Sequence, residues 1–404
     1  MTPLSPAPSG GARQVVRVML CDDSATVRSA FARLLGHDPG IEIIGRVGDG
    51  QQALDAIAAL PPADRPNVLL LDLEMPVMDG MTALPLLLKL QPSLAVIVAS
   101  ALTQRGAEVT MAAMRSGAAD YVPKPSASAG GMSDPAFGAE LLAKVRGWAR
   151  VRSALRPSSQ AALPMPRFVP ARRPAPAAAP APVVLPATAV PRRPAAPSLA
   201  AVPRGRPRLL AIGSSTGGPQ ALASFVRRLT SPLPVPGVIV QHMPAGFTAM
   251  LADHLSRLGG PGVAEAQDGE ALRPGRLYVA PGDRHLLVEA ASGGLVGRLT
   301  SDPAENFCRP AVDPMLRSAV KACDGKVLAV ILTGMGQDGM LGCKAVAAAG
   351  GTVMAQDEAS SVVWGMPGAV AKAGLAEVLL PPEQLAERVV AQLGTALAAA
   401  GGMA

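Results

Sequence analysis

Ser215 lies between glycines, in a setting suited to covalent catalysis. It is the central residue of Gly213-Ser-Ser-Thr-Gly217, which follows the apolar run 209–212 and precedes a predicted helix that begins near Pro219. The spacing matches the G-x-S-x-G nucleophile elbow, in which glycines permit a tight turn and free N–H groups at the helix start favour developing negative charge. A glycine-rich loop after a strand can equally bind phosphate, so this motif alone leaves both roles open.

A serine nucleophile needs a base, and the chain has four histidines, one of them in the amino-terminal half. His242 comes directly after the apolar run 238–240, so we expect it at the same sheet edge as Ser215. His285 is the alternative base, but it lies further from a strand end, and a substrate-lining or structural role is favoured. His254 falls within a predicted helix, where a surface or core role is expected.

The base in turn needs a carboxylate to orient it. Asp338 lies in a glycine-rich loop that follows the apolar run 328–332. We therefore expect Ser215, His242 and Asp338 to form a catalytic triad, and the glycines to leave N–H groups free for an oxyanion hole. The alternative role for Asp338 is an N-cap of the predicted helix 340–348.

Acidic residues also follow apolar runs in the amino-terminal half. Asp22 and Asp23 come after the run 15–20, and Asp72 closes the run 68–73. Because the carboxyl ends of parallel strands meet at one sheet edge, these carboxylates should lie together. They repel one another unless a cation lies between them, and Mg²⁺ prefers such oxygen ligands. A carboxylate held beside Mg²⁺ can accept a phosphoryl group.

Two further residues of this edge could bind the phosphoryl group. Lys124 follows the short apolar stretch 121–122 and would neutralise the incoming charge. The hydroxyl of Ser100, after the run 96–99, could bond a phosphoryl oxygen. Any one acidic residue could be a helix cap or a solvated side chain, but several ordered segments favour a phosphoryl site.

Two α/β domains must position these residues. Strand-like runs alternate with helical stretches over 15–150 and again over 207–396, as is typical of doubly wound parallel sheets with helices on both faces. The intervening segment 151–206 is rich in Pro, Ala and Arg and is expected to be a flexible linker. We expect a disordered extension at 1–14 and a frayed tail at 397–404.

The composition argues against several functional classes. No apolar run approaches the roughly 18 residues of a spanning helix, and the polar amino terminus does not resemble a secretory signal, so a cytoplasmic protein without membrane insertion is expected. The formal net charge is +7, but much of the excess is arginine in the linker region with few aromatic residues nearby, which favours a solvated linker over nucleic-acid binding. The four cysteines are widely spaced, as in reduced thiols.

Four segments of the amino-terminal half occur in the order found in a known family: Cys21-Asp-Asp23, Asp72-Leu-Glu-Met-Pro-Val-Met-Asp-Gly80, Ser100 and Tyr121-Val-Pro-Lys-Pro125. Together they resemble a response-regulator receiver domain, which has a flavodoxin-like fold. The resemblance implies that Asp72 is the phosphoacceptor and that Asp22 and Asp23 bind Mg²⁺ with it. It also implies a switch pair, Ser100 and Tyr121, and a phosphate-sensing cation, Lys124.

The carboxy-terminal half contains a second ordered set: Ile212-Gly-Ser-Ser-Thr-Gly-Gly218, Gln241-His-Met-Pro244, Pro310-Ala-Val-Asp313, Leu332-Thr-Gly-Met-Gly-Gln-Asp-Gly339 and Gly365-Met-Pro367. The order Ser, His, Asp differs from that of the α/β-hydrolases. The set resembles the catalytic domain of the CheB protein-glutamate methylesterases, which implies a Rossmann-like, three-layer fold. It implies the triad above, with the Met335 N–H as oxyanion donor and Thr216 positioning His242.

The resemblance also implies function and partners. The expected enzyme is a serine hydrolase, activated by phosphorylation, that demethylates γ-glutamyl methyl esters on chemoreceptors and deamidates glutamines, with no cofactor in the esterase site. The phosphodonor would be the chemotaxis histidine kinase, and a monomer is expected. In the family the unphosphorylated receiver covers the catalytic cleft, although the long linker here weakens that expectation. The alternative is a related esterase that serves a receptor system outside chemotaxis.

Overall fold

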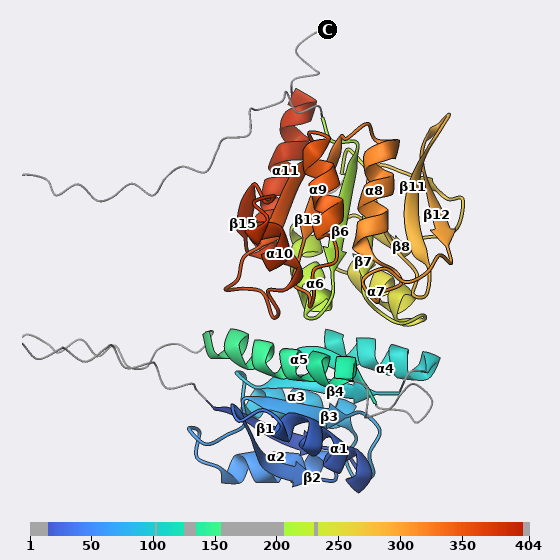
Figure 1. Cartoon of the computed structure of the whole chain (residues 1–404). Helices are drawn as coiled ribbons and strands as arrows, with labels where there is room; N and C mark the ends of the chain where they lie inside the picture. The colour runs from blue at the N-terminus through green and yellow to red at the C-terminus, as the bar shows by residue number, and fades with distance from the viewer. Residues whose placement is uncertain (1–14, 102, 125–134, 155–205, 230–232, 399–404) are drawn as a thin grey trace, which may run out of the picture.

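The computed structural model describes residues 15–101, 103–124, 135–154, 206–229 and 233–398. The expected extension at 1–14 and most of the expected linker and tail lie outside these residues. The described residues form two α/β domains (Figure 1). None of their helices combines the length and the apolar character needed to cross a bilayer.

The amino-terminal domain is a five-stranded parallel sheet with the strand order β2-β1-β3-β4-β5. The expected strands in this domain are confirmed to within about one residue at each end. The last helix continues to Ala154, beyond the expected domain end at 150. The elements are β1 (Val16–Cys21), α1 (Ala25–Gly36), β2 (Ile41–Val47), α2 (Gly50–Ala59), β3 (Val68–Asp72), α3 (Gly80–Leu90), β4 (Ala95–Ser100), α4 (Gln104–Arg115), β5 (Asp120–Pro123) and α5 (Pro135–Ala154).

The carboxy-terminal domain has a seven-stranded parallel sheet with the order β15-β14-β13-β6-β7-β10-β8. Its elements up to the middle of the domain are β6 (Leu209–Ser214), α6 (Gly218–Arg228), β7 (Gly237–Gln241), α7 (Phe247–Ser256), β8 (Gly262–Glu265), β9 (Ala271–Leu272), β10 (Arg276–Val279), β11 (His285–Ala291) and β12 (Gly294–Thr300). The remainder are α8 (Val312–Ala322), β13 (Val327–Ile331), α9 (Met340–Ala348), β14 (Thr352–Gln356), α10 (Met366–Lys372), β15 (Val378–Leu380) and α11 (Pro382–Ala398).

Helices cover both faces of this sheet, so the three-layer prediction is confirmed. One apolar cluster joins the sheet to α6, α7 and α11, and a second joins it to α8, α9 and α10. A small antiparallel sheet with the order β11-β12-β9 was not predicted from the sequence. Its strands are short or exposed on one face, so they lack the long apolar runs that mark the central strands.

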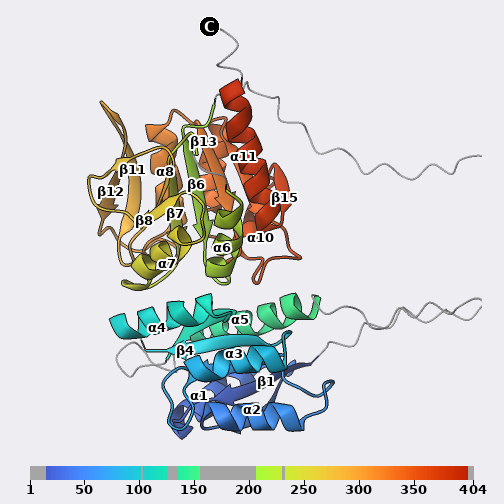
Figure 2. The same ribbon diagram turned by 180° about the vertical axis from the view of Figure 1, so that it is seen from behind.

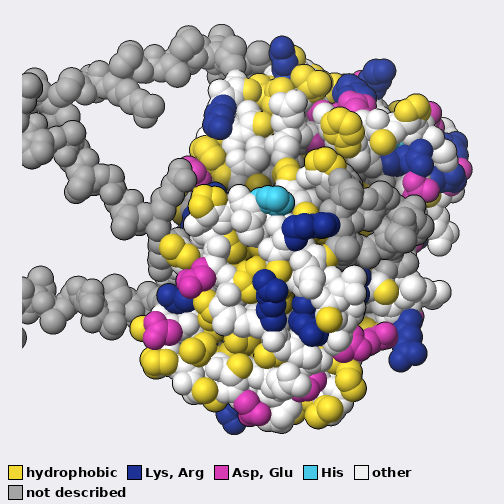
Figure 3. Space-filling view, turned by 60° about the horizontal axis from the view of Figure 1, so that its bottom comes forward, with side chains coloured by type: hydrophobic (Ala, Val, Ile, Leu, Met, Phe, Trp, Pro, Cys, Tyr) yellow, Lys and Arg dark blue, Asp and Glu magenta, His cyan; other side chains and the backbone are white. Residues whose placement is uncertain are grey.

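The two domains pack against each other through α4 and α5 of the first domain (Figures 1 and 2). Helix α4 lies against α7, and one buried apolar cluster contains Met111 of α4, Tyr121 of β5 and Phe247 of α7. Val362 of the second domain belongs to the apolar core around α5. On the face in Figure 3, basic and acidic side chains are interspersed rather than gathered into one basic area.

Candidate functional site

The carboxyl ends of β6 and β7 bring Ser215 next to His242. The two strands pair from Leu210 with Gly237 to Ser214 with Gln241, so the residues that follow them emerge together. The His242 N–H donates to the Ser214 carbonyl (3.1 Å), and Gln241 Nε2 donates to the Ser215 carbonyl (2.9 Å). The turn at Ser215 is thus held by the neighbouring strand.

Two glycines permit the close approaches at this edge. A Cβ at Gly218 would lie 1.9 Å from Gln241 Oε1, and a Cβ at Gly334 would lie 2.8 Å from the Cβ of Ser215. Both contacts are shorter than side chains tolerate, so these positions require glycine. The 333–339 loop therefore lies directly against the serine turn.

The carboxylate of Asp338 binds the imidazole of His242. Its Oδ2 lies 2.8 Å from His242 Nε2. The carboxylate also accepts the N–H groups of Val312 (2.6 Å) and Asp313 (3.1 Å), at the amino end of α8. The alternative role of Asp338 as the N-cap of α9 is wrong, because Gly339 occupies that position without a side-chain cap.

Charge and hydrogen bonding shift the pKa values of this pair in opposite directions. Burial raises the pKa of Asp338, but the hydrogen bond from His242 and the two helix N–H groups outweigh it, so the net shift is downward. Burial disfavours a charged imidazole, but Asp338 and the sulfur of Cys308 outweigh it and raise the pKa of His242 to about 9. The pair therefore favours an imidazolium beside a carboxylate.

The second imidazole nitrogen faces a thiol in this structure. His242 Nδ1 lies 3.3 Å from Cys308 Sγ, and among the described residues no hydrogen bond joins Ser215 Oγ to His242. Because Nε2 binds Asp338, Nδ1 is the nitrogen left for the serine. Catalytic hydrogen bonds often form only when substrate is bound, so this arrangement is compatible with a serine–histidine pair.

A candidate oxyanion donor lies beside the serine. Met335 follows Gly334 in the loop that touches Ser215, and its side chain is exposed. In the described part of the chain, no acceptor is found for the Met335 N–H. Thr216 is buried, and its carbonyl accepts from Thr333 Oγ1 (2.9 Å). No hydrogen bond between the Thr216 hydroxyl and His242 is present in the described residues, so its positioning role stays a prediction.

Among the described residues, no hydrogen bond joins Ser215 to either of the other two histidines of this domain. His285 is buried, with Nε2 3.1 Å from the Pro303 carbonyl and Nδ1 accepting the Ala311 N–H (3.2 Å). Both ring nitrogens thus hold loops together, which fits the structural one of the two roles expected for His285, substrate-lining or structural. His254 lies in α7, where burial lowers its pKa.

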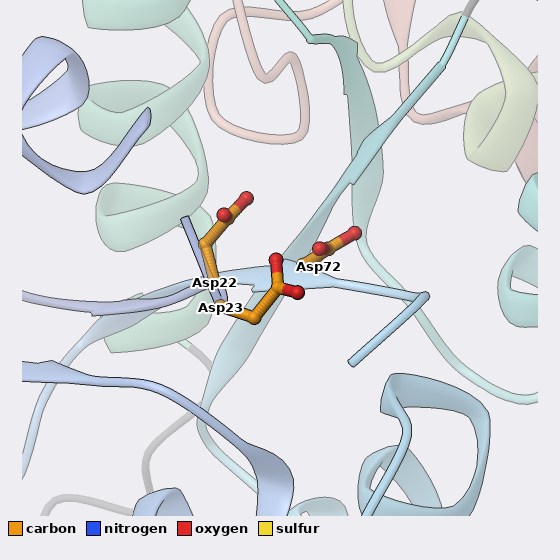
Figure 4. Close-up of side chains that lie close together, drawn as sticks. All are labelled: Asp22, Asp23 and Asp72. Atoms are coloured by element: carbon orange, nitrogen blue, oxygen red, sulfur yellow. The ribbon is translucent and has the colours of Figure 1, made fainter. Parts of the chain in front are cut away.

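The amino-terminal acidic site forms at the ends of β1 and β3. Oxygens of Asp22, Asp23 and Asp72 lie within 4.8 Å of one another, and Figure 4 shows the three carboxylates side by side. Lys124 Nζ lies 3.2 Å from Asp22 and 2.5 Å from Asp72. Three carboxylates with one ammonium leave excess negative charge, which fits the oxygen donor set of Mg²⁺.

The pKa values at this site reflect the crowding. Burial raises the pKa of Asp72; Lys124 opposes this, and Asp22 adds to it. Burial works against the charged form of Lys124, but the two carboxylates outweigh it and raise the lysine pKa. A divalent cation here would relieve the repulsion between the carboxylates.

The expected switch residues, Ser100 and Tyr121, lie on the neighbouring strands β4 and β5, where Tyr121 pairs with Val98 and Ser100 with Pro123. The Ser100 hydroxyl donates to the Gly106 carbonyl in α4 (3.1 Å). The Tyr121 ring is buried between the domains and stacks on Phe247 of α7, with ring centroids 5.3 Å apart. Tyr121 therefore contacts the second domain directly.

A buried carboxylate of the first domain, Asp120, bonds to the turn that carries Ser215. Asp120 Oδ2 accepts the N–H of Gly217 (3.1 Å), two residues after Ser215, and the Nε1–H of Trp148 (3.0 Å). Lys144 is also buried there, 3.7 Å from Asp120. The first domain thus bonds to the start of α6, next to the nucleophile.

Three residues that contact these sites were not predicted from the sequence: Asn306, Cys308 and Asp120. Asn306 Nδ2 donates to Asp338 Oδ1 (2.9 Å) and to Asp313 Oδ2 (3.0 Å). The only available signal was the position of Asn306 and Cys308 just before the 310–313 motif. Nothing local marks Asp120, because its partner Gly217 belongs to the other domain.

The fold and the comparisons with known proteins define a hydrolase domain joined to a receiver domain. The family described as the CheB methylesterase matches residues 210–389, and the response regulator receiver domain matches residues 18–131. A protein-glutamate methylesterase/protein-glutamine glutaminase of Azospirillum brasilense is 48% identical over 397 residues, covering 95% of each chain. A protein of the same name, numbered 1, from Paramagnetospirillum magneticum is 49% identical over 387 residues, covering 95% of this chain and 96% of its own.

A solved structure is also similar: the CheB methylesterase catalytic domain of Thermotoga maritima is 43% identical, with a TM-score of 0.45, and covers 46% of this chain and 98% of its own. The identity and coverage of the two whole-chain relatives decide the classification. The chain belongs to the CheB methylesterase family, with a response-regulator receiver domain, and is a carboxylic ester hydrolase.

Proposed function

We propose that the chain is a phosphorylation-activated methylesterase that removes methyl groups from γ-glutamyl methyl esters of chemoreceptors and deamidates receptor glutamines. The observation that carries the proposal is the meeting, at one sheet edge, of Ser215, the buried His242–Asp338 pair and the Met335 N–H. The names of the two relatives, which pair methylesterase with glutaminase, support the substrate class.

In the proposed reaction, Ser215 Oγ attacks the ester carbonyl while His242 takes the hydroxyl proton. The oxygen that becomes negative accepts the Met335 N–H, and removing one such donor typically costs about 2.7–4 kcal/mol of transition-state stabilisation. His242 then returns the proton to the leaving methanol, and water releases glutamate from the acyl-enzyme. With a glutamine substrate the leaving group is ammonia. Asp338 holds the imidazole and stabilises its charged form.

The control step begins at Asp72, which accepts a phosphoryl group from a histidine kinase. Mg²⁺ held by Asp22, Asp23 and Asp72 would neutralise charge during this transfer. The new phosphoryl group competes for Lys124, which pairs with Asp72 in the unphosphorylated protein. Lys124 directly follows β5, whose Tyr121 and Asp120 contact the second domain. A shift of β5 would therefore loosen the contact beside Ser215.

The domain contact supports repression in the unphosphorylated state. A Cβ at Gly147 of α5 would lie 2.2 Å from the Val362 carbonyl, and Arg150 donates to the Ser361 carbonyl (2.5 Å). Together with the Tyr121–Phe247 stack, these contacts hold the receiver against the loops of the esterase edge. We also propose that the chain acts in the cytoplasm and as a monomer.

Ser215→Ala tests the proposal. Methanol release from methylated receptor in membranes should fall by at least about 10³-fold, with and without a small phosphodonor, because the variant lacks the nucleophile. Circular dichroism should show unchanged folding. Ser292→Ala is the control, since Ser292 is exposed in the turn between β11 and β12, outside the sheet edge that carries Ser215. Undiminished release by Ser215→Ala would refute the assignment.

A further inference from the structure

Phe307 is fully exposed on a turn beside the triad. Its relative exposure is 104%, and its φ is +63°, a value that favours glycine. The preceding residue, Asn306, has a φ of +53°, so both central residues of the turn are left-handed, as in the tight turns of β-hairpins. Asparagine suits such a position, but an aromatic residue does not. Phenylalanine therefore occupies a strained position without packing into the protein.

The turn is held firmly to the catalytic carboxylate. Glu305 and Cys308 exchange two backbone hydrogen bonds across it, of 3.1 and 2.9 Å. Asn306 Nδ2 donates to Asp338 Oδ1 and Asp313 Oδ2. These hydrogen bonds fix the backbone that carries the Phe307 ring next to the triad. Strained residues concentrate where they contribute to function.

Phe307 and Asn306 line a surface hollow of about 670 Å³. The hollow continues from Gly336, the residue after Met335, to Trp364 and α10. Lys372 is its one charged lining residue, and the Lys372 ammonium lies 5.8 Å from the centroid of the Trp364 ring. Within the described residues Lys372 forms no ion pair. The hollow thus offers two aromatic surfaces and one unpaired positive charge beside the triad.

We infer that this hollow binds the receptor helix that carries the ester, with Phe307 as the apolar anchor and Lys372 as the partner of a neighbouring glutamate. The inference rests on the proposed function and names how that substrate is held. Its occupant is an amphipathic, acidic helix rather than a second copy of this chain.

The chemistry of the proposed substrate favours a receptor helix as the occupant of the hollow. An amphipathic helix presents apolar residues three or four positions from the ester side chain, so one of them can reach Phe307 while the ester reaches Ser215. Each turnover leaves a carboxylate on the helix, so a partly demethylated receptor becomes more acidic and Lys372 attracts it. Aromatic anchors commonly dominate such interfaces.

The test compares Phe307→Ala and Phe307→Gly with wild type as full-length, phosphodonor-treated proteins. Methanol release is measured against the concentration of methylated receptor in nanodiscs, and Ser215 reactivity is measured separately by the labelling rate of a fluorophosphonate probe. We expect the receptor KM to rise about tenfold in both variants. The labelling rate should stay within about twofold of wild type, because the small probe does not reach the turn. Lys372→Ala should raise KM less and weaken its dependence on salt.

Phe307→Gly separates binding from folding. Glycine relieves the left-handed strain, so the variant should unfold at a denaturant concentration no lower than wild type while its KM rises. Leu86→Ala is the control, since Leu86 is an exposed apolar side chain on α3 of the receiver. A wild-type KM in both Phe307 variants, or an equal loss of probe labelling, would overturn the inference. If wild type is labelled at Ser215 but releases no methanol from the receptor, the proposed function falls, and the inference falls with it.

Discussion

Asp72 and Asp338 lie at corresponding edges of the two parallel sheets, and each is only 2% exposed, yet their pKa values move in opposite directions. Asp72 shares its site with two other carboxylates and a single lysine. Asp338 has an acidic neighbour as well, since Asn306 Nδ2 donates to both the Asp338 and the Asp313 carboxylates. Asp338 nevertheless accepts five hydrogen bonds or ion-pair contacts, from His242, Val312, Asp313, Asn306 and Gly339.

Burial raises the pKa of both carboxylates, so their different partners decide the direction of the net shift. Asp338 is satisfied by the protein alone, so it can hold a charge permanently and orient His242. Among the described residues, Asp72 accepts only from Lys124 and the Glu74 N–H, which fits the proposed Mg²⁺ site.

The largest expected effect comes from removing the charge of Asp338. In Asp338→Asn the amide cannot stabilise the imidazolium or hold the productive tautomer. The kcat for methanol release should therefore fall on the order of 10³–10⁴-fold. Steady-state assays on methylated receptor measure this loss, with Asp283→Asn, an exposed aspartate, as the control. A fall in kcat of less than about tenfold would contradict the role of Asp338 in holding and charging His242, and with it the difference drawn between Asp338 and Asp72.

The pH dependence of kcat/KM should report the raised pKa of His242 in the His242–Asp338 pair. His242 acts as a base only when neutral, and its pKa is raised to about 9, so the neutral fraction grows as the pH rises. We expect kcat/KM to increase with pH, up to about tenfold per unit well below the pKa, and to level off near pH 9. A profile that is already flat at neutral pH would contradict the raised pKa. The measurement is methanol release at saturating phosphodonor over this range.

The smallest effect is expected at Asp72. Asp72→Asn removes the proposed phosphoacceptor and one carboxylate of the proposed Mg²⁺ site, so stimulation by a small phosphodonor should disappear. Basal turnover should persist, because the residue lies outside the esterase site. Removing Mg²⁺ with a chelator should have the same effect on wild type. Stimulation that survives both treatments would show that the acidic site does not control the esterase.

Much of this architecture could be predicted from local sequence. The apolar runs identified the central strands of both sheets, and the polar residues that follow them identified both sites, because parallel strands deliver their carboxyl ends to one edge. Thus the sequence alone predicts that Ser215 lies near His242 and that Asp22 lies near Asp72. The small β11-β12-β9 sheet was missed because its strands lack such runs.

By itself, the sequence determined which residue types reach each sheet edge, since strand periodicity and glycine turns act over a few neighbours. Only the tertiary structure decided what those residues touch: Asp338 binds the start of α8 instead of capping α9, and Cys308 faces His242 Nδ1. Asp120 reaches Gly217 across the domain boundary, 97 positions along the chain. Such contacts depend on how whole domains and loops pack, and no local pattern of residues encodes that packing.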